Sequence, residues 1–162
     1  MPTPEFVLRL REKVGNDELW LSGITAVVVR GSGDDREVLL VKRADNGAWT
    51  AVTGIIDPGE PPAVAAEREV LEEADIVAVA ERLARVHVED RVVVYENGDR
   101  SRYLDLTFLC RYVSGEPFPA DGENTEAGWF RPGALPEMRE EHLERIRVAL
   151  ADEVAARFQR SS

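Results

Sequence analysis

The chain has 162 residues, 44 % of them hydrophobic and 31 % charged, which suits one globular domain and argues against a disordered chain. Its formal net charge of −11 argues against duplex nucleic acid as a partner, because proteins that bind duplexes present basic faces. The chain has a single cysteine, Cys110, which suits a reducing compartment. It has no apolar run near the ~20 residues of a membrane span, and Met1 to Arg11 lacks the layout of a signal peptide. These features predict a cytoplasmic protein without a membrane partner.

The first part of the chain predicts one helix and two strands. Apolar residues at helical spacing predict a short helix over about residues 4–14. The Val-rich run from Trp20 to Val29 predicts a strand, and the Gly/Asp cluster from Gly31 to Asp35 predicts a turn. Val38 to Lys42 predicts a second strand, which we expect to pair with the first as a hairpin.

Residues 54–76 combine a Gly/Pro-rich loop with a helix. Pro61 and Pro62 can open the helix, because the first helical positions need no intrahelical N–H partner. On a helical wheel one side gathers charged residues: Arg68, Glu69, Glu72 and Glu73. Like charges one turn apart oppose a helix by roughly 0.2–0.5 kcal/mol per pair. Either this face is simply solvated, or its carboxylates bind a divalent cation, for which oxygen ligands favour Mg²⁺, with Mn²⁺ as the alternative.

The full spacing of this segment favours the cation. Gly54, five residues, Glu60, seven residues, Arg68-Glu69, two residues and Glu72-Glu73 follow one another in a single register. This pattern resembles the Nudix box, the signature of the Nudix hydrolase family and of its MutT-like members. The resemblance extends over about residues 23–130.

Two positions depart from the family pattern. Asp75 stands where the family has a glycine that ends the helix, and Asp is among the few residues that tolerate a left-handed conformation. Thr53 replaces the glycine that most relatives carry immediately before the box, and in the family this residue's backbone carbonyl often binds the metal. We expect the fold to survive, with a slightly altered helix end and the Thr53 carbonyl still available.

Strands and a final helix complete the predicted domain. Residues 76–77 and 81–88 predict a strand region, and residues 92–95 and 102–112 predict two further strands with an Asn-Gly turn between them. Apolar spacing predicts a C-terminal amphipathic helix over about residues 137–159. The resemblance implies a single Nudix domain over residues 1–162, with its core at about 20–131, folded as an α/β/α sandwich with a central mixed β-sheet and the catalytic loop-helix.

The resemblance also implies a reaction, namely hydrolysis of a nucleoside diphosphate linked to another moiety. Metal ions would be held by Glu69 and Glu73, with Glu72 completing the set and Glu60 and the Thr53 carbonyl supporting it. Arg68 would orient the glutamates through charge-assisted hydrogen bonds. The glycine-rich loop that begins at Gly54 would let the backbone approach the metal–diphosphate unit.

Other parts of the chain supply candidates for substrate binding and for the base. Arg43 matches an arginine that contacts the nucleotide in MutT-like relatives, with an exposed edge charge as the alternative. Trp49 is a second candidate, although a core position suits it better. The general base is left open between the box glutamates and a late acid: Glu116, which matches best in local sequence, Glu123 or Glu126.

The substrate remains open between nucleoside triphosphates, sugar nucleotides and dinucleoside polyphosphates, with a lean towards a MutT-like or general nucleotide pyrophosphohydrolase. One alternative is a Nudix-fold binding or regulatory module without turnover, which the intact glutamate set disfavours. A second is an isomerase of the isopentenyl-diphosphate type, which needs a reactive cysteine and histidine ligands where this chain has only Cys110, His87 and His142. Many relatives dimerise, so a homodimer is a further expectation.

Overall fold

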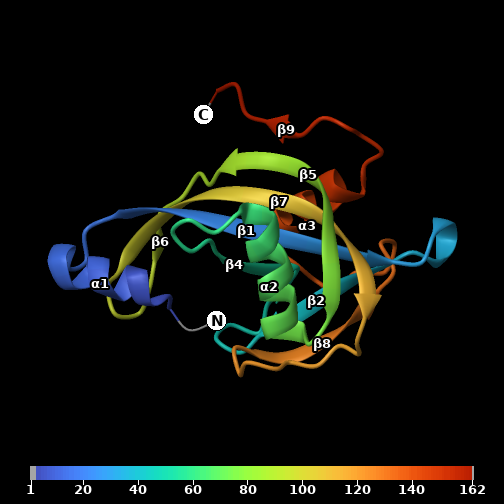
Figure 1. Cartoon of the computed structure of the whole chain (residues 1–162), viewed down its shortest axis with the longest axis horizontal. Coiled ribbons are helices and arrows are strands. Elements are labelled where there is room, and N and C mark those ends of the chain that lie inside the picture. The colour runs from blue at the N-terminus through green and yellow to red at the C-terminus, as the bar shows by residue number, and fades with distance from the viewer. Residues whose placement is uncertain (1–2, 162) are drawn as a thin grey trace.

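A mixed β-sheet forms the centre of the computed structural model, which describes residues 3–161. The described residues form nine strands, whose main path runs β3-β2-β1-β7-β5-β9, while β4 pairs with β1, β6 with β7 and β8 with β2 (Figure 1). The parallel pairing of β1 with β7 and the antiparallel pairing of β5 with β7 make the sheet mixed. The strands are β1 (Leu19–Arg30), β2 (Glu37–Arg43), β3 (Trp49–Thr50), β4 (Val52–Ile55), β5 (Val77–Val88), β6 (Val93–Val94), β7 (Arg100–Ser114), β8 (Asn124–Phe130) and β9 (Arg157–Phe158).

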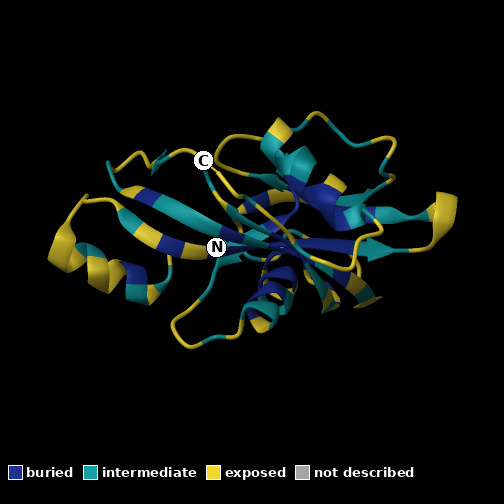
Figure 2. Cartoon of the chain, turned by 90° about the horizontal axis from the view of Figure 1, so that it is seen from above, coloured by how far each residue is buried: buried dark blue, intermediate teal, exposed yellow. Residues whose placement is uncertain are grey.

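Helices cover both faces of this sheet. Helix α2 (Pro62–Ala74) lies on one face and α3 (Glu140–Leu150) on the other, and each has its own apolar core (Figure 2). Ala66 and Val70 of α2 pack with Ile24 of β1, whereas Ile146 of α3 packs with Val27. The α/β/α sandwich with a central mixed sheet is therefore confirmed.

The sheet follows the predicted strands closely, because their Val- and Ile-rich sequences favour extended backbone. The expected hairpin between the first two strands is present but short, since the β1–β2 register covers only Val29 with Val38 and Arg30 with Glu37. A 3₁₀ turn, Gly33–Asp35, connects these strands. The Asn-Gly turn is confirmed, with Gly98 at a φ of 88°.

Asp75 ends α2 in the left-handed conformation, with φ 55° and ψ 34°. Its amide donates to the Leu71 carbonyl, which satisfies one carbonyl of the last helical turn. A β-carbon on Gly115 would lie 2.5 Å from the Asp75 carbonyl oxygen, so only glycine lets β7 turn this close to the helix end. The tolerance expected of Asp at the family's glycine position is confirmed.

The C-terminal helix is shorter than predicted. It spans Glu140–Leu150, and the residues expected to continue it form an extended tail that pairs through β9 with β5. Arg82 of β5 donates to the carbonyls of Ala149 and Ala151, so the last helical carbonyls are satisfied by the sheet. Val154 and Phe158, two apolar residues within the range predicted as helix, are 94 % and 63 % exposed, because no surface of the domain covers them there.

A buried polar network fastens α3 to the sheet. Arg145 donates to Thr25 Oγ1 at 3.0 Å and to Glu89 Oε1 at 2.8 Å, and Thr25 donates to Asp105 at 2.7 Å. Hydrogen bonds to charged groups are stronger than neutral ones, so this network helps to fix the position of α3 on the sheet.

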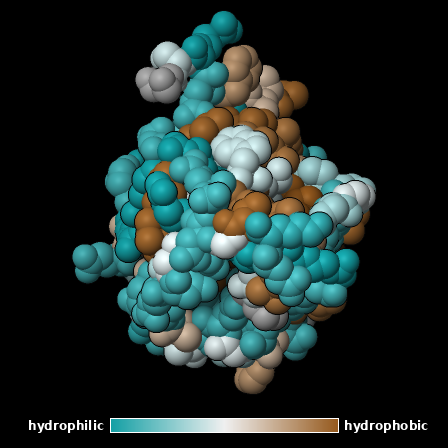
Figure 3. Space-filling view, turned by 90° about the vertical axis from the view of Figure 1, so that its left-hand side faces the viewer, coloured by the Kyte–Doolittle hydropathy of each residue, from teal (hydrophilic) through white to brown (hydrophobic). Residues whose placement is uncertain are grey.

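Helix α1 (Glu5–Val14) lies at one end of the sheet, beside β6 and the start of β7 (Figure 1). This end of the molecule shows mainly polar side chains with apolar ones among them (Figure 3), and its exposed apolar residues include Leu8, Trp20 and Val94. Among residues 3–161, no helix is both long enough and apolar enough to cross a membrane.

Candidate active site

Gly54 lies in β4, just before the loop that leads to α2, and its backbone lies directly against the side chain of Glu69. A β-carbon built on Gly54 would lie 2.2 Å from Glu69 Cδ and 2.3 Å from its Oε1. Atoms cannot approach that closely, so any other residue at position 54 would displace the carboxylate. Position 54 must therefore be glycine to leave room for Glu69, which lies fifteen residues later in the sequence and which helix α2 places next to Gly54.

Arg68 connects the loop to the glutamates. Its guanidinium donates to Glu60 at 2.7 and 2.9 Å, to Glu69 at 2.8 Å, to Glu72 at 3.3 Å and to the Ile55 carbonyl at 3.3 Å. Glu60 also accepts the backbone N–H of Asp57. Glu60 therefore supports the loop and Arg68 directly, and Arg68 orients the two glutamates on its other side.

Glu69 is fully buried, and only one of its two oxygens is satisfied. Among residues 3–161 no hydrogen-bond donor reaches Oε2, whereas Oε1 accepts from Arg68. Burial raises the pKa of Glu69 to about 8, the charges of Glu73 and Glu72 add to this effect, and Arg68 opposes it. A buried carboxylate with an unpaired oxygen is costly unless a cation is bound there.

Glu73 sits one turn further along α2 and is also buried. Burial raises its pKa to about 7, and the neighbouring Asp121 adds to the effect. Asn124 donates to Glu73 Oε2 at 3.4 Å. Perturbed pKa values cluster at functional sites, so the two adjacent carboxylates make this face of α2 a candidate site.

The loop between β7 and β8 brings two further acids to Glu73. The amides of Phe118 and Ala120 donate to the carbonyls of Ala74 and Glu73, so the loop is fastened across the end of α2. Beyond this point Asp121 and Glu123 each place a carboxylate oxygen within 4.8 Å of Glu73 and of each other. Three carboxylates at this separation can hold one metal ion.

The fold places the three candidate late acids, Glu116, Glu123 and Glu126, in different surroundings. Glu123 joins the cluster around Glu73, whereas Glu116 lies exposed earlier in the loop and outside that cluster. Glu126 is on β8, where it pairs with Lys42 at 2.9 Å. The geometry favours Glu123, together with Asp121, over Glu116.

Asp121 and Asn124 are the residues that the sequence reasoning did not assign. The Asp121-Gly122 pair is the sequence feature that could have indicated them, because it predicts a turn directly before a strand, and such a turn fixes the residues beside it. Gly122 has a φ of 80°, and the Asp121 carboxylate accepts the Glu123 amide across this turn. The pairing of β8 with β2 decides which residue this turn faces, and no local sequence pattern shows that pairing.

Arg43 lies at the end of β2, opposite Asn124 in the β2–β8 register. Its guanidinium donates two hydrogen bonds to Asp45, at 2.9 and 2.6 Å, and its side chain is 42 % exposed. The Asp45 hydrogen bond is the main reason that the pKa of Arg43 is raised, and the charge of Glu73 contributes. Arg43 thus stands near the carboxylate cluster as an accessible cation.

Trp49 packs on the α3 side of the sheet. Its ring meets Phe130 edge to face at a centroid separation of 5.0 Å, within the apolar core that includes Ile146. The box glutamates lie on α2, across the sheet from that core. The geometry favours the core role of Trp49 over a substrate contact.

Thr53 lies in β4, opposite Thr25 in the antiparallel pairing with β1. The Ile56 amide donates to the Ser22 carbonyl, and hydrogen-bonded rungs alternate along an antiparallel pair. The Thr25–Thr53 rung is therefore a non-bonded one, which directs the Thr53 carbonyl away from β1. That carbonyl is available to a ligand.

The chain also matches known proteins. The NUDIX domain profile matches residues 21–151, most of the chain and all of the site described above. The chain belongs to the Nudix hydrolase family. This Nudix hydrolase is 34 % identical to a MutT-like protein from Streptomyces ambofaciens, over 78 % of this chain and 75 % of the relative.

It is also 34 % identical to the dihydroneopterin triphosphate diphosphatase of Escherichia coli K12, over 78 % of each chain. Among solved structures, an ADP-ribose pyrophosphatase from Streptococcus suis shares the fold, with a TM-score of 0.65 and 22 % identity over 86 % of this chain and 98 % of that one. The family is one of pyrophosphohydrolases, and the carboxylates of this Nudix hydrolase fit a divalent metal ion.

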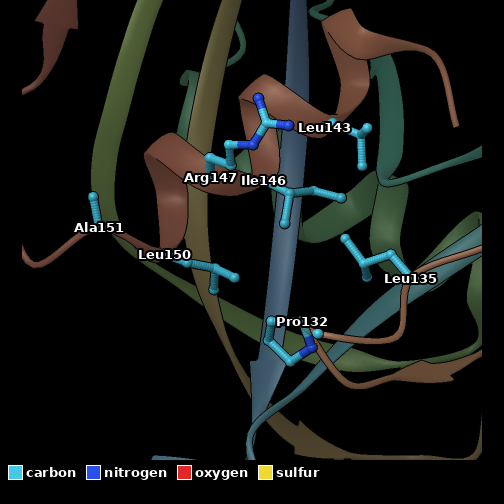
Figure 4. A pocket seen from close by; sticks show the side chains of 8 residues that line it. Pro132, Leu135, Leu143, Ile146, Arg147, Leu150 and Ala151 are labelled. Atoms are coloured by element: carbon cyan, nitrogen blue, oxygen red, sulfur yellow. The ribbon is translucent and has the colours of Figure 1, made fainter.

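The surface of the described residues includes the two cavities that follow. One, of about 500 Å³, is lined mainly by apolar side chains of α3 and the loop before it, including Leu135, Ile146 and Leu150 (Figure 4). It lies on the face opposite α2 and holds no carboxylate among its lining residues. The other, of about 480 Å³, lies between α1 and the box and includes Arg68 and Glu72.

The raised pKa values predict how stability depends on pH. Between pH 6.5 and 8 the folded, metal-free protein holds protons on Glu69 and Glu73 that the unfolded chain, with glutamate pKa values near 4.5, has released. Stability therefore falls as pH rises through this window. Below pH 6.5 His142 opposes this trend. Burial lowers the pKa of His142 to about 3, so its imidazole is neutral in the folded protein and takes up a proton on unfolding, which lowers stability as the pH falls.

Thermal unfolding in EDTA measures this effect. The Tm is expected to fall between pH 6.5 and pH 8, by roughly 2–4 °C for each kcal/mol lost. Adding Mg²⁺ should raise the Tm more at pH 8 than at pH 6.5, because the ion binds the ionised carboxylates. A flat or rising Tm across this window in EDTA would contradict the burial of the two glutamates.

Proposed function

We propose that this Nudix hydrolase uses Mg²⁺, with Mn²⁺ as a substitute, to cleave the diphosphate linkage of a nucleoside diphosphate derivative. The observation that carries the proposal is Glu69, a fully buried carboxylate with one oxygen that no donor among residues 3–161 reaches, one helical turn from a second buried glutamate, Glu73. A site that keeps two acids out of water with one oxygen unsatisfied is organised for a cation.

The residues divide into three tasks. Glu69, Glu73, Glu72 and the Thr53 carbonyl would hold metal, and Asp121 and Glu123 extend the ligand set at Glu73. Arg68 and Glu60 hold the ligands in position. When bound, the ions neutralise the phosphates and acidify a water. A carboxylate of the Glu73 cluster would serve as the base that accepts a proton from water.

The substrate class follows the relatives and the local charges. Relatives of this chain are named for triphosphate and ADP-ribose substrates. We assign this enzyme to the nucleoside triphosphate or sugar nucleotide class. The exposed guanidinium of Arg43, next to the Glu73 cluster, is the residue we propose to contact the substrate phosphates.

The isomerase alternative has no support in the site. Cys110 is 1 % exposed, and burial raises its pKa to about 12, so its thiol does not ionise at neutral pH. The chain has a single cysteine and so cannot form an internal disulfide, which supports the proposed cytoplasmic location. Neither Cys110 nor a histidine belongs to the carboxylate cluster around Glu73.

A product assay tests the function directly. The protein is incubated with Mg²⁺ or with EDTA and with ADP-ribose, 8-oxo-dGTP, dGTP, NADH and diadenosine polyphosphates, beside the variant Glu73→Gln. We expect cleavage of at least one substrate at its diphosphate, dependent on Mg²⁺ and abolished in the variant. Metal binding without cleavage of any substrate would instead support a Nudix-fold binding module.

A further inference from the structure

A cleft of about 480 Å³ separates α1 from the box, a size that ligand pockets commonly have. One wall carries Arg68 and Glu72 of α2 with Pro58 of the loop, so the cleft borders one of the proposed metal ligands, Glu72. The other wall is formed by Phe6 and Arg9 of α1. A group attached to a diphosphate bound at the box can therefore reach α1.

Helix α1 precedes the residues that the NUDIX profile matches, 21–151. The helix is held in place from its far end. Arg11 donates to the carbonyls of Asp17 and Arg100 at 2.6 Å each and to Ser101 Oγ at 3.0 Å, and Val7 is buried. Phe6 is therefore presented to the cleft by a fixed element.

The lining of the cleft selects one kind of group. The half-buried ring of Phe6, with Pro4 and Pro58 nearby, offers flat apolar surface on which a base or a sugar face can stack. Three carboxylates, on Glu5, Asp57 and Glu72, face two guanidinium groups. A further phosphate would be repelled by this excess of acids, whereas hydroxyl groups can donate to them.

We propose that the cleft binds the nucleoside or sugar carried on the second phosphate, with Phe6 as the residue that determines specificity for it. The enzyme then prefers diphosphates that bear an organic group at both ends over nucleotides that end in a bare phosphate. This inference rests on the proposed function, because the diphosphate must lie at the box for its second group to reach α1.

Binding of non-hydrolysable analogues tests the inference separately from turnover. The dissociation constants of α,β-methylene-ADP-ribose and α,β-methylene-dGTP are measured with Mg²⁺ for the wild type, Phe6→Ala, Phe6→Tyr and Leu8→Ala. Leu8 is the matched control, since it is an exposed apolar residue of the same helix outside the cleft.

We expect Phe6→Ala to weaken binding of the ADP-ribose analogue by about tenfold, as loss of one stacking contact does, and to leave the dGTP analogue within about twofold. Phe6→Tyr should restore binding, and Leu8→Ala should change neither constant. An equal effect on both analogues, no effect on either, or no binding of the ADP-ribose analogue by the wild type overturns the inference. If instead no panel substrate is cleaved but this selectivity in binding persists, the proposed function fails and the cleft assignment stands.

Discussion

Replacing Glu69 by glutamine is expected to lower kcat by at least about 100-fold while making the metal-free protein more stable. The carboxylate is fully buried, with Oε2 unsatisfied among the described residues, so its charge is useful only when a cation is bound. Metal ions contribute several kcal/mol to the transition state, and each ~1.4 kcal/mol corresponds to tenfold in rate. Losing a ligand therefore costs about two powers of ten or more.

The gain in stability has the same origin. Burial raises the pKa of Glu69 to about 8, so at neutral pH the folded state must keep a proton that the unfolded state has released. Glutamine removes this cost, and we expect the free energy of unfolding in EDTA at pH 8 to rise by about 1–3 kcal/mol. Arg68 keeps its two hydrogen bonds to Glu60 in the variant.

The two readouts are initial rates at saturating Mg²⁺ and urea denaturation in EDTA. Glu67→Gln is the matched control on the same helix, because Glu67 accepts the Ala80 amide away from the box, and a glutamine oxygen can do the same. Near-normal turnover in Glu69→Gln would remove this residue from the metal site. Lower stability in EDTA would show instead that the carboxylate is satisfied in the folded protein.

Substitution of Gly54 by alanine is expected to cause a comparable loss of activity without removing any charged group. The new methyl carbon would lie 2.2 Å from Glu69 Cδ, so the glutamate must leave its position. Overpacking of this kind costs about 1–3 kcal/mol of stability. The displaced carboxylate should also weaken Mg²⁺ binding, measured by calorimetry, so activity and metal affinity fall together.

Gly133→Ala is the control for this variant, because a β-carbon there meets nothing within 4 Å. A double-mutant cycle identifies the cause. If contact with Glu69 is responsible, the stability cost of Gly54→Ala should largely disappear when Glu69 is already alanine, since the obstructing side chain is gone. Full additivity of the two substitutions would place the effect in the backbone rather than in this contact.

Local chemistry allowed much of the fold to be predicted from the sequence. The helix of residues 62–74 is specified by its opening prolines and uninterrupted helix formers, and its end by the tolerance of Asp75 for a left-handed conformation. Alternation and β-branched residues located the long strands. The cluster of Arg68, Glu69, Glu72 and Glu73 on one face followed from helical spacing alone, because residues one turn apart share a face.

The same local reasoning failed where a contact crosses the chain. Helical spacing predicts that the C-terminal helix continues through Val154 and Phe158, but spacing cannot show whether any surface covers those residues. The choice among Glu116, Glu123 and Glu126 depended on how β8 pairs with β2, and this pairing brings Glu123 and the unassigned Asp121 to Glu73.

The sequence by itself determined the family and the glutamate face of α2, because both rest on short-range spacing, and the sandwich fold followed from the family resemblance. Only the tertiary structure decided which late acids meet Glu73, that Trp49 packs against Phe130 on the α3 side, and that α1 forms a wall of the cleft beside the box. These features depend on contacts between residues far apart in the sequence, from 48 positions for Glu73 and Asp121 to 81 for Trp49 and Phe130. Such contacts are set by the packing of the whole sheet rather than by any local pattern.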